Sequence, residues 1–274
     1  MSLACGRCDG CRSERSREWA VRMMHEARYH EVSSFVTFTY RPECIPADLS
    51  LDYSDFQGFM RRLRRERMKE WHPPQVLPVT RFFMCGEYGS KKDRPHYHAA
   101  LFGVDFSGDR KPWKKSGAGF QLYISARLDR LWGRGSCFIG DLSAESAAYM
   151  ARYTLKKTSL DDPAYESVNR VTGEIFPRKL EFCHMSLKPG IGARWFDEFK
   201  SDCFPHDRVV VKGRVQKPPR YYFKRLKQSD PDMHEAIVQD RILAGRARFE
   251  DTTVERLAVR EVVHKARIAF YKRS

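Results

Sequence analysis

The 274-residue sequence contains no apolar run long enough to span a bilayer, and its N-terminal segment is too polar for a signal peptide. We therefore expect an intracellular protein that has no membrane partner. Internal repeats and low-complexity tracts are also absent. Because 42% of the residues are hydrophobic and 13% are aromatic, the chain is able to form a sizeable core.

Acidic residues are few relative to basic ones: 35 Asp and Glu stand against 50 Lys and Arg, a formal net charge of +15. This excess of positive charge predicts a polyanionic partner, although charge alone does not separate DNA from RNA or from an anionic membrane. The sequence also has no G-x-x-x-x-G-K-[S/T] loop, the phosphate-binding signature of P-loop ATPases. Any step that needs such an ATPase, for example strand separation, is therefore expected to depend on another protein.

Eight cysteines are present, and a reducing cytoplasm would keep them as thiols or metal ligands. Cys5, Cys8 and Cys11 have the spacing of zinc ligands, but three thiolates need a fourth partner. The side chains that could supply it, none of them with diagnostic spacing, are Cys44, His25 and His30. A structural zinc and three free thiols are both compatible with this pattern.

The most informative pair of residues is His96 and His98. Because they are two apart, their imidazoles project from the same face if the segment is a strand. Pairing of segments 80–87 and 95–103 as a hairpin would bring Glu87 close to both histidines. Two nitrogens and one carboxylate oxygen suit a divalent metal ion that keeps open positions for substrate. By itself, a His-x-His pair is more often a pair of surface histidines.

A helix is predicted for residues 143–157, because the segment has good helix formers, no Gly or Pro, and a start marked by Ser143 and Ser146. Tyr149 and Tyr153 are four residues apart and therefore share one helix face. Two lysines fall in the same sector, Lys156 and Lys157. Phenols beside a cation and a metal-bound phosphate are suited to nucleophilic attack on a phosphodiester. A tyrosine stripe packed on a sheet is the structural alternative.

Three motifs occur in a fixed order: an apolar strand, the histidine pair, and the tyrosine helix with its lysine. In this sequence they are residues 35–40, His96-Tyr97-His98 and Tyr149-x-x-x-Tyr153-x-x-Lys156. The combination resembles the HUH endonuclease superfamily, and within it the replication initiators of microviruses, which are small single-stranded DNA phages. The Cys-Gly-x-Cys-x-x-Cys-Arg run and segment 16–20 are similar to the same group, and the resemblance covers residues 4–200. One departure is Tyr97, because this position of the motif is usually aliphatic.

The resemblance implies site-specific, metal-dependent nicking and joining of single-stranded DNA, which starts and ends rolling-circle replication of a circular phage genome. The implied ligands of Mg²⁺ or Mn²⁺ are Glu87, His96 and His98. The implied catalytic residues are Tyr149 and Tyr153, which would form phosphotyrosine links, with Lys156 or Lys157 as the neighbouring cation. The implied partners are the single-stranded origin, the replicative-form DNA, and a host helicase and polymerase, in the cytoplasm of the bacterial host.

Two other functions are compatible with parts of the sequence. A plasmid initiator or a single-strand transposase would share the metal site and the chemistry, but paired tyrosines fit a replicative initiator better. A non-catalytic nucleic-acid-binding protein with a structural zinc would account for the charge and the N-terminal cysteines. It would leave the histidine and tyrosine motifs unexplained, and it would never become covalently linked to DNA.

Hydrophobic periodicity predicts an α+β fold with a central antiparallel sheet flanked by helices, the ferredoxin- or RRM-like split βαβ arrangement that the HUH resemblance also implies. Predicted helices are 13–30, 52–70, 122–132, 143–157 and 193–200, and predicted strands are 35–40, 80–87, 95–103, 137–142 and 182–187. A hairpin is expected around Gly173, residues 209–215 are β-prone, and 230–272 are expected to form a C-terminal helical appendage. Three parts are predicted: a cysteine-containing segment and helix (1–30), the HUH endonuclease domain (31–200) and a basic, mainly helical region (201–274).

Three clusters of basic or mixed basic and aromatic residues are predicted to contact DNA. They are the helix positions Arg61, Arg62, Arg64, Arg65 and Arg67, the run Trp113-Lys114-Lys115, and the run 221–225. A solvated charged surface is the alternative interpretation of each cluster, because such runs also occur on ordinary protein surfaces.

Overall fold

A seven-stranded sheet forms the middle layer of the computed structural model, which describes residues 4–6, 8–75, 77, 79–89, 93–152, 166–168, 173–211 and 213–273. In spatial order its strands are β4 (Lys111–Lys115), β5 (Gln121–Ile124), β6 (Cys137–Asp141), β1 (Ser33–Phe38), β3 (Pro95–Phe102), β2 (Arg81–Tyr88) and β9 (Phe182–Met185). Every pair of neighbouring strands is antiparallel.

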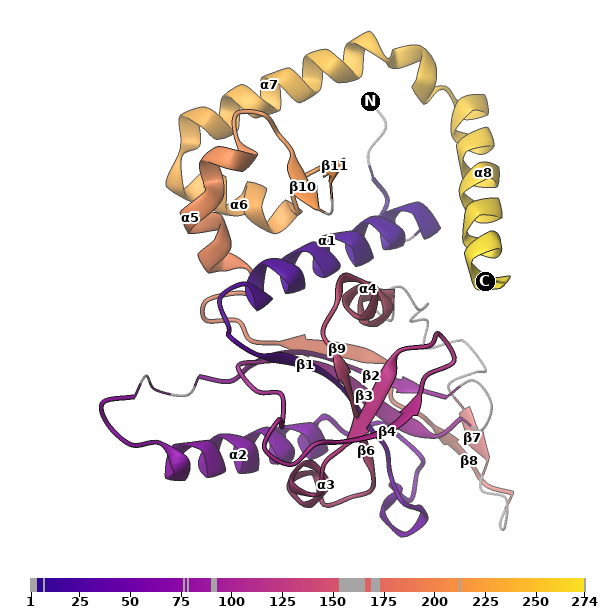
Figure 1. Cartoon of the computed structure of the whole chain (residues 1–274). Helices are drawn as coiled ribbons and strands as arrows, with labels where there is room; N and C mark the ends of the chain where they lie inside the picture. Colours follow the sequence, from indigo (N-terminus) through magenta and orange to yellow (C-terminus); the bar gives the residue numbers. More distant parts are fainter. Residues whose placement is uncertain are drawn as a thin grey trace.

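Helices cover both faces of this sheet (Figure 1). One face packs against α1 (Asp9–Ala27) and α4 (Ala144–Arg152), and the other packs against α2 (Tyr53–Glu70) and α3 (Ala126–Trp132). The predicted class, an α+β fold with an antiparallel sheet flanked by helices, is therefore confirmed. Within the described ranges, no helix is both long enough and apolar enough to cross a membrane.

The inner strands are connected as in a split βαβ unit. Strand β1 leads through α2 to β2, but β3 lies between these two strands in the sheet. A second helix, α3, precedes β6, which pairs with the free side of β1. The predicted hairpin of 80–87 with 95–103 is present as β2 and β3. Because β3 has a neighbour on each side, its side chains are held from both edges.

Alternation along β3 gives its two faces different roles. Tyr97, Ala99 and Leu101 are fully buried in the core that also contains Phe56 and Leu63 of α2. Residues of the other parity, such as Ala100 and Phe102, pack instead with α1 and α4. The pattern follows the period of two that is expected for a strand with both faces covered.

Residues 122–132 do not form one helix, contrary to the prediction. Their first part is strand β5, and the helix α3 begins only after Ser125, whose side chain accepts a hydrogen bond from the Leu128 amide. Ser125 has extended backbone angles and is the N-cap, so it separates strand from helix. Strand β4, which pairs with β5, is an element that the periodicity missed, because all five of its residues are exposed.

A second hydrophobic core lies on the far side of α1 from the sheet. Val21 of α1 belongs to this core, whereas Met23 belongs to the core between α1 and the sheet. The other elements here are α5 (Ala193–Cys203), α6 (Arg220–Ser229), α7 (Pro231–Ala247) and the hairpin of β10 (Val209–Val211) with β11 (Arg214–Gln216). Helix α1 therefore stabilises the sheet and the C-terminal part together.

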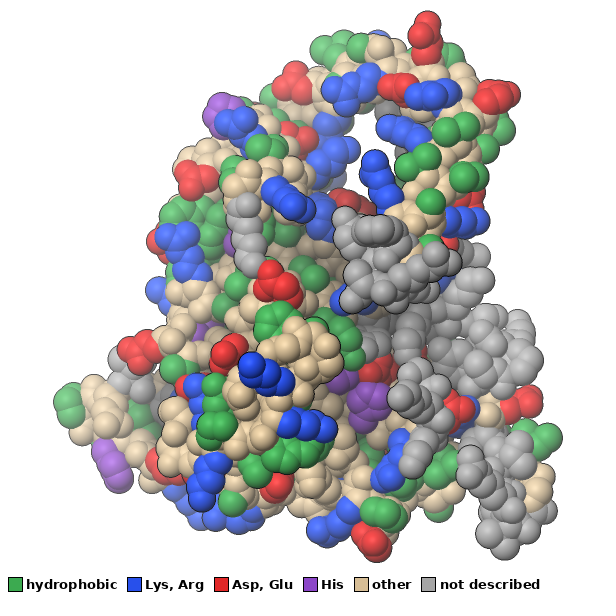
Figure 2. Space-filling view, turned by 45° about the vertical axis from the view of Figure 1, so that its right-hand side comes forward, with side chains coloured by type: hydrophobic (Ala, Val, Ile, Leu, Met, Phe, Trp, Pro, Cys, Tyr) green, Lys and Arg blue, Asp and Glu red, His purple; other side chains and the backbone are tan. Residues whose placement is uncertain are grey.

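The predicted C-terminal helical appendage is present as α7 and α8 (Val254–Arg273), joined by the 3-10 turn η4 (Phe249–Thr252). These helices form an arch over the N-terminal end of α1 (Figure 1), where Ser13 Oγ lies 3.1 Å from His264 Nε2. Lys and Arg side chains border the opening beneath the arch (Figure 2). The helix α6 was not predicted. The remaining elements are η1 (Pro42–Cys44) and the expected hairpin around Gly173, formed by β7 (Glu166–Val168) and β8 (Ile175–Pro177).

Replacement of Phe59 by Ala tests the packing of α2 on the sheet. The ring is fully buried against Phe38 and Phe56, so we expect a loss of about 3–5 kcal/mol in the free energy of unfolding. Chemical denaturation followed by circular dichroism measures it. Met68→Ala, on the same helix at a side chain that is 47% exposed, should change stability by less than about 1 kcal/mol. Equal losses in the two variants would contradict this packing.

Candidate metal centre

The register between β2 and β3 brings Glu87, His96 and His98 together. Glu87 is directly opposite His96, and His98 projects from the same face of β3. Glu87 Oε1 lies 2.5 Å from Nε2 of His96 and 2.9 Å from Nε2 of His98. Their ligand atoms all lie within 4.8 Å of one another. The three side chains that were expected to meet in this hairpin therefore do meet.

Each imidazole is oriented by a contact of its other nitrogen. His96 Nδ1 lies 3.1 Å from the carbonyl oxygen of Arg94, and His98 Nδ1 lies 2.9 Å from Thr37 Oγ1. A carbonyl only accepts, so the Nδ1 of His96 carries the hydrogen and a neutral ring has its lone pair on Nε2. Such second contacts commonly fix metal-binding histidines. Both Nε2 atoms consequently face the same carboxylate oxygen.

A lone pair that faces an anionic oxygen at 2.5 Å is repulsive unless a positive charge lies between them. A proton on Nε2 or a bound cation would supply that charge. Two imidazole nitrogens and one carboxylate oxygen form a donor set that fits a divalent metal ion and leaves further coordination positions open. The residues present therefore suit such an ion.

The carboxylate of Glu87 is ionised in this environment. Only 4% of Glu87 is exposed, and burial alone would raise its pKa. Hydrogen bonds from His96 and His98, together with their charge, outweigh burial and lower the pKa of Glu87 to about 2. At neutral pH this side chain is therefore an anionic ligand in a largely water-excluded place.

Helix α4 brings Tyr149 next to the histidines. The helix begins as predicted, because Ser143 Oγ accepts from the Ser146 amide and Ser146 Oγ accepts from the Ser143 amide, a reciprocal cap. The Tyr149 ring lies edge-on to His98, with 5.4 Å between ring centroids, and the residue is 37% exposed. The guanidinium of Arg152 lies 5.6 Å from the same ring. Three predicted catalytic residues lie outside the described residues: Tyr153, Lys156 and Lys157.

Two contributors to this site were missed from the sequence. Thr37 belongs to a strand that was predicted, but only the register of β1 with β3 places it opposite His98. Arg94 contributes through its backbone carbonyl, for which side-chain patterns give no signal. Both residues orient imidazoles rather than offering a ligand atom themselves.

The N-terminal cysteines form a second compact group. Cys5 Sγ and Cys11 Sγ are 3.9 Å apart, and all three sulfur atoms lie within 4.8 Å of one another. The Cys8 amide lies 3.3 Å from Cys5 Sγ, and the Cys11 amide lies 3.5 Å from Cys8 Sγ. Cys8 is also the N-cap of α1, where a helix favours negative charge.

The three side chains considered as a fourth partner for the cysteines have other contacts. Cys44 Sγ accepts a hydrogen bond from Arg41, and His30 Nε2 lies 3.4 Å from Glu26. His25 is buried, with its Nδ1 2.9 Å from the hydroxyl of Tyr222. Within the described residues, the cysteine group therefore contains three ligands and no fourth.

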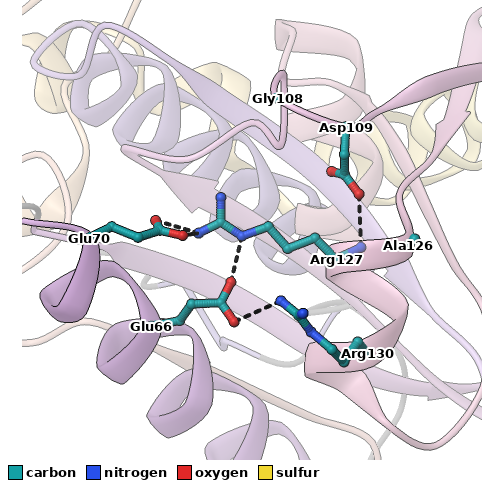
Figure 3. Close-up of a pocket in the computed structure, with 7 residues that line it drawn as sticks. All are labelled: Glu66, Glu70, Gly108, Asp109, Ala126, Arg127 and Arg130. Carbon is teal, nitrogen blue, oxygen red and sulfur yellow. Dashed lines mark hydrogen bonds and ion pairs between the residues drawn. The ribbon is translucent and has the colours of Figure 1, made fainter.

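The predicted DNA-binding arginines lie on α2, behind the sheet as seen from the metal centre. Several of them hold the chain together: Arg62 donates to the carbonyls of Leu131 and Trp132, and Arg64 donates to the carbonyl of Thr80. The neighbouring pocket between α2 and α3 contains ion pairs of both signs (Figure 3). These pairs join Glu66 and Glu70 with Arg127 and Arg130. Arg61 and Arg65 remain exposed on this face.

The other two predicted DNA-binding clusters differ from each other. In the run 221–225, Arg22 stacks on Tyr221, and Arg225 is paired with Asp197 at 2.6 Å. These side chains help to join α6 to α1 and α5. Lys114 and Lys115, in contrast, are exposed on the edge strand β4 together with Trp113.

Comparisons with known proteins give a consistent family of relatives. A family model of replication-associated proteins of the ORF2 type matches residues 33–158. Replication-associated protein VP4 of Bdellovibrio phage phiMH2K is 30% identical over 236 residues, which cover 85% of this chain and 70% of the relative. Replication-associated protein ORF2 of Spiroplasma virus 4 is 30% identical over 247 residues, covering 84% and 69%. For replication-associated protein ORF4 of Chlamydia phage 1, the values are 32% over 231 residues, 82% and 54%. No solved structure matches the chain.

Replacement of Thr37 by Val tests the orientation of His98. The variant keeps the shape of the side chain and removes its contact with Nδ1, so we expect Mn²⁺ to bind about 10-fold more weakly. Isothermal titration calorimetry with Mn²⁺ measures the change. Thr39→Val is a matched control, because the Thr39 hydroxyl donates to the carbonyl of Ser136 instead. If both variants bound Mn²⁺ like the unaltered protein, Thr37 would not orient a ligand.

Proposed function

This chain belongs to the family of replication-associated proteins of the ORF2 type, and from that premise we propose that it nicks and rejoins single-stranded DNA through a phosphotyrosine link. The reaction would start and end rolling-circle replication of a circular single-stranded DNA phage genome. The resemblance to microvirus replication proteins that the sequence motifs indicated is confirmed by these relatives.

The observation that supports this proposal most is the convergence of two imidazole nitrogens on one oxygen of Glu87. We infer that Glu87, His96 and His98 hold Mg²⁺ or Mn²⁺ there. Such an ion, when bound, withdraws charge from the scissile phosphate and holds it for in-line attack. The split βαβ core supports the HUH fold, in which this centre and the tyrosine helix face each other.

The chain's own tyrosines would carry out the transfer. One phenolic oxygen, of Tyr149 or Tyr153, attacks the phosphorus while the bond from phosphorus to the 3′-oxygen breaks. The phenolic proton is transferred, in net terms, to the departing oxygen, which leaves a 5′-phosphotyrosine and a free 3′-hydroxyl. Lys156 or Lys157 would be the cation that favours the phenolate. The edge-on position of Tyr149 against His98 supports its place at the scissile phosphate.

The second tyrosine would act after one round of synthesis. It would cut the regenerated origin, while the free 3′-hydroxyl attacks the first phosphotyrosine and closes the released circle. Because the energy of the phosphodiester is kept in the protein link, no ATP is required, which agrees with the missing P-loop motif. The host would then supply the helicase and the polymerase, and the origin strand and replicative-form DNA would be the substrates, in the bacterial cytoplasm.

We assign the endonuclease to residues 31–200, flanked by the cysteine-containing segment and helix (1–30) and by the C-terminal region (201–274). A plasmid initiator or transposase would have the same centre, but the relatives described above are replication-associated proteins of phages. A non-catalytic binding protein would have no need for the geometry around Glu87.

Covalent linkage to DNA tests the proposed chemistry. A labelled single-stranded origin oligonucleotide, incubated with the protein and Mn²⁺, should give a band that survives denaturing electrophoresis and is absent with EDTA. His96→Ala and the double variant Tyr149→Phe with Tyr153→Phe should give no band, and the single variants identify the first nucleophile. Tyr123→Phe, at a tyrosine on the opposite face of the sheet, should give the band in full. A chain that binds every origin strand but never becomes linked would be a binding protein.

We also propose that Cys5, Cys8 and Cys11 bind one structural zinc ion, with water as the fourth ligand. At a zinc–sulfur distance of about 2.3 Å, tetrahedral geometry separates two sulfur atoms by about 3.8 Å, close to the 3.9 Å between Cys5 and Cys11. The amide hydrogens that point at Cys5 and Cys8 favour the thiolate form. An iron–sulfur cluster fits less well, since each cysteine there binds a different iron and the sulfurs lie farther apart.

Zinc content tests this second site. Elemental analysis of protein purified without chelators should find one equivalent of zinc that is lost in Cys8→Ser and kept in Cys44→Ser, since Cys44 lies outside the group. Equal zinc content in the two variants would leave the cysteines as thiols.

A further inference from the structure

An exposed pair of aromatic rings lies on the same face of the sheet as the metal centre. Trp113 of β4 stacks on Phe138 of β6, with 4.5 Å between ring centroids and 13° between ring planes. Trp113 is 45% exposed, which is unusual for so large an apolar side chain. The pair therefore presents a flat aromatic surface to solvent.

Strand register connects this pair with the metal centre. Phe138 is directly opposite Thr37 on β1, and Thr37 is directly opposite His98 on β3. Directly opposite residues project from the same face of a sheet, so Phe138, Thr37 and His98 form one row. Two strand spacings of about 4.8 Å separate the ends of the row, roughly 10 Å. A DNA strand held at the metal centre would reach this distance within a few nucleotides.

Positive charge accompanies the rings. All five residues of β4 are exposed, and three of them are lysines: Lys111, Lys114 and Lys115. The ammonium group of Lys114 lies 4.0 Å from the centroid of the Trp113 ring. A cation–π contact at an exposed site is weaker than the stacking of a base on an aromatic ring, so a base would displace this ammonium group. The lysine would then be free to contact the adjacent phosphate.

The other basic clusters are less suited to hold the reacting strand. The arginines of α2 lie on the opposite face of the sheet, and those nearest α3 bind backbone carbonyls. The run 221–225 is engaged with α1 and α5. Among the three clusters predicted from the sequence, only that of β4 combines exposure, an aromatic surface and the face of the metal centre.

On the basis of the proposed nicking function, we propose that Trp113, supported from below by Phe138, stacks on an unpaired base of the DNA strand whose phosphate lies at Glu87, His96 and His98. Lys111, Lys114 and Lys115 contact the phosphates on either side of that base. The platform selects unpaired DNA, because a base inside a duplex has no face available for stacking. It accepts any base, since each base has a π-face.

The test separates contacts with bases from contacts with phosphates. Two fluorescent 12-nucleotide strands are titrated in EDTA, where no cleavage occurs: one of dT, the other with abasic sites throughout. The unaltered protein should bind the dT strand more tightly. Trp113→Ala should weaken binding of the dT strand roughly 5- to 100-fold and leave the abasic strand unchanged. Trp113→Phe should retain most of the preference for dT.

Two further variants serve as controls. Phe120→Ala removes an aromatic residue that is 55% exposed in the turn of the same hairpin and should keep the preference for dT. Lys115→Ala should weaken both strands alike and lower the dependence on salt concentration by about one phosphate contact.

The inference would be overturned if Trp113→Ala distinguished the two strands as well as the unaltered protein does, or if Phe120→Ala lost as much preference. Because binding is measured without metal, its outcome is independent of nicking. A protein that stacks bases on Trp113 but never forms the covalent link would refute the proposed function and keep the platform.

Discussion

The register of β2 against β3 is the constraint on which the candidate centre depends. A shift by one residue would turn Glu87 to the opposite face of the sheet from His96, because the period of a strand is two. The far face of β3 holds this register. There the Tyr97 hydroxyl donates to the carbonyl of Asp52 at 2.8 Å and accepts from the Asp52 amide at 2.9 Å. A polar contact in the core of α2 thus fixes the ligands on the other side.

This anchoring also accounts for the tyrosine where the superfamily usually has an aliphatic residue. Tyr97 is fully buried, and burial raises its pKa to about 12, so the phenol is neutral. Its hydroxyl lies 2.9 Å from that of Tyr40, which donates to Asp55 at 2.5 Å. Every polar atom that the larger side chain adds is therefore satisfied, and its ring fills the same core that an aliphatic side chain would reach.

Local periodicity was enough to predict much of the site. His96 and His98 share a face because of strand alternation, and the reciprocal cap of Ser143 and Ser146 marks the start of α4. The sequence does not reveal which strands become neighbours, so Thr37 and Phe138 could not be connected with His98. Strand β4 was missed for a different reason: an exposed edge strand buries no face and carries no alternating pattern. The division of α1 between two cores likewise depends on partners that are distant in sequence.

The metal centre, the tyrosine helix and the aromatic pair all lie on one face of the sheet, so the position of the ion decides how the other parts can act. Anomalous X-ray scattering from crystals grown with Mn²⁺ measures that position most directly. We predict one strong peak in contact with an oxygen of Glu87 and with Nε2 of His96 and His98. Direct contacts between Glu87 and both histidines with no peak between them, at saturating Mn²⁺, would contradict a metal centre here.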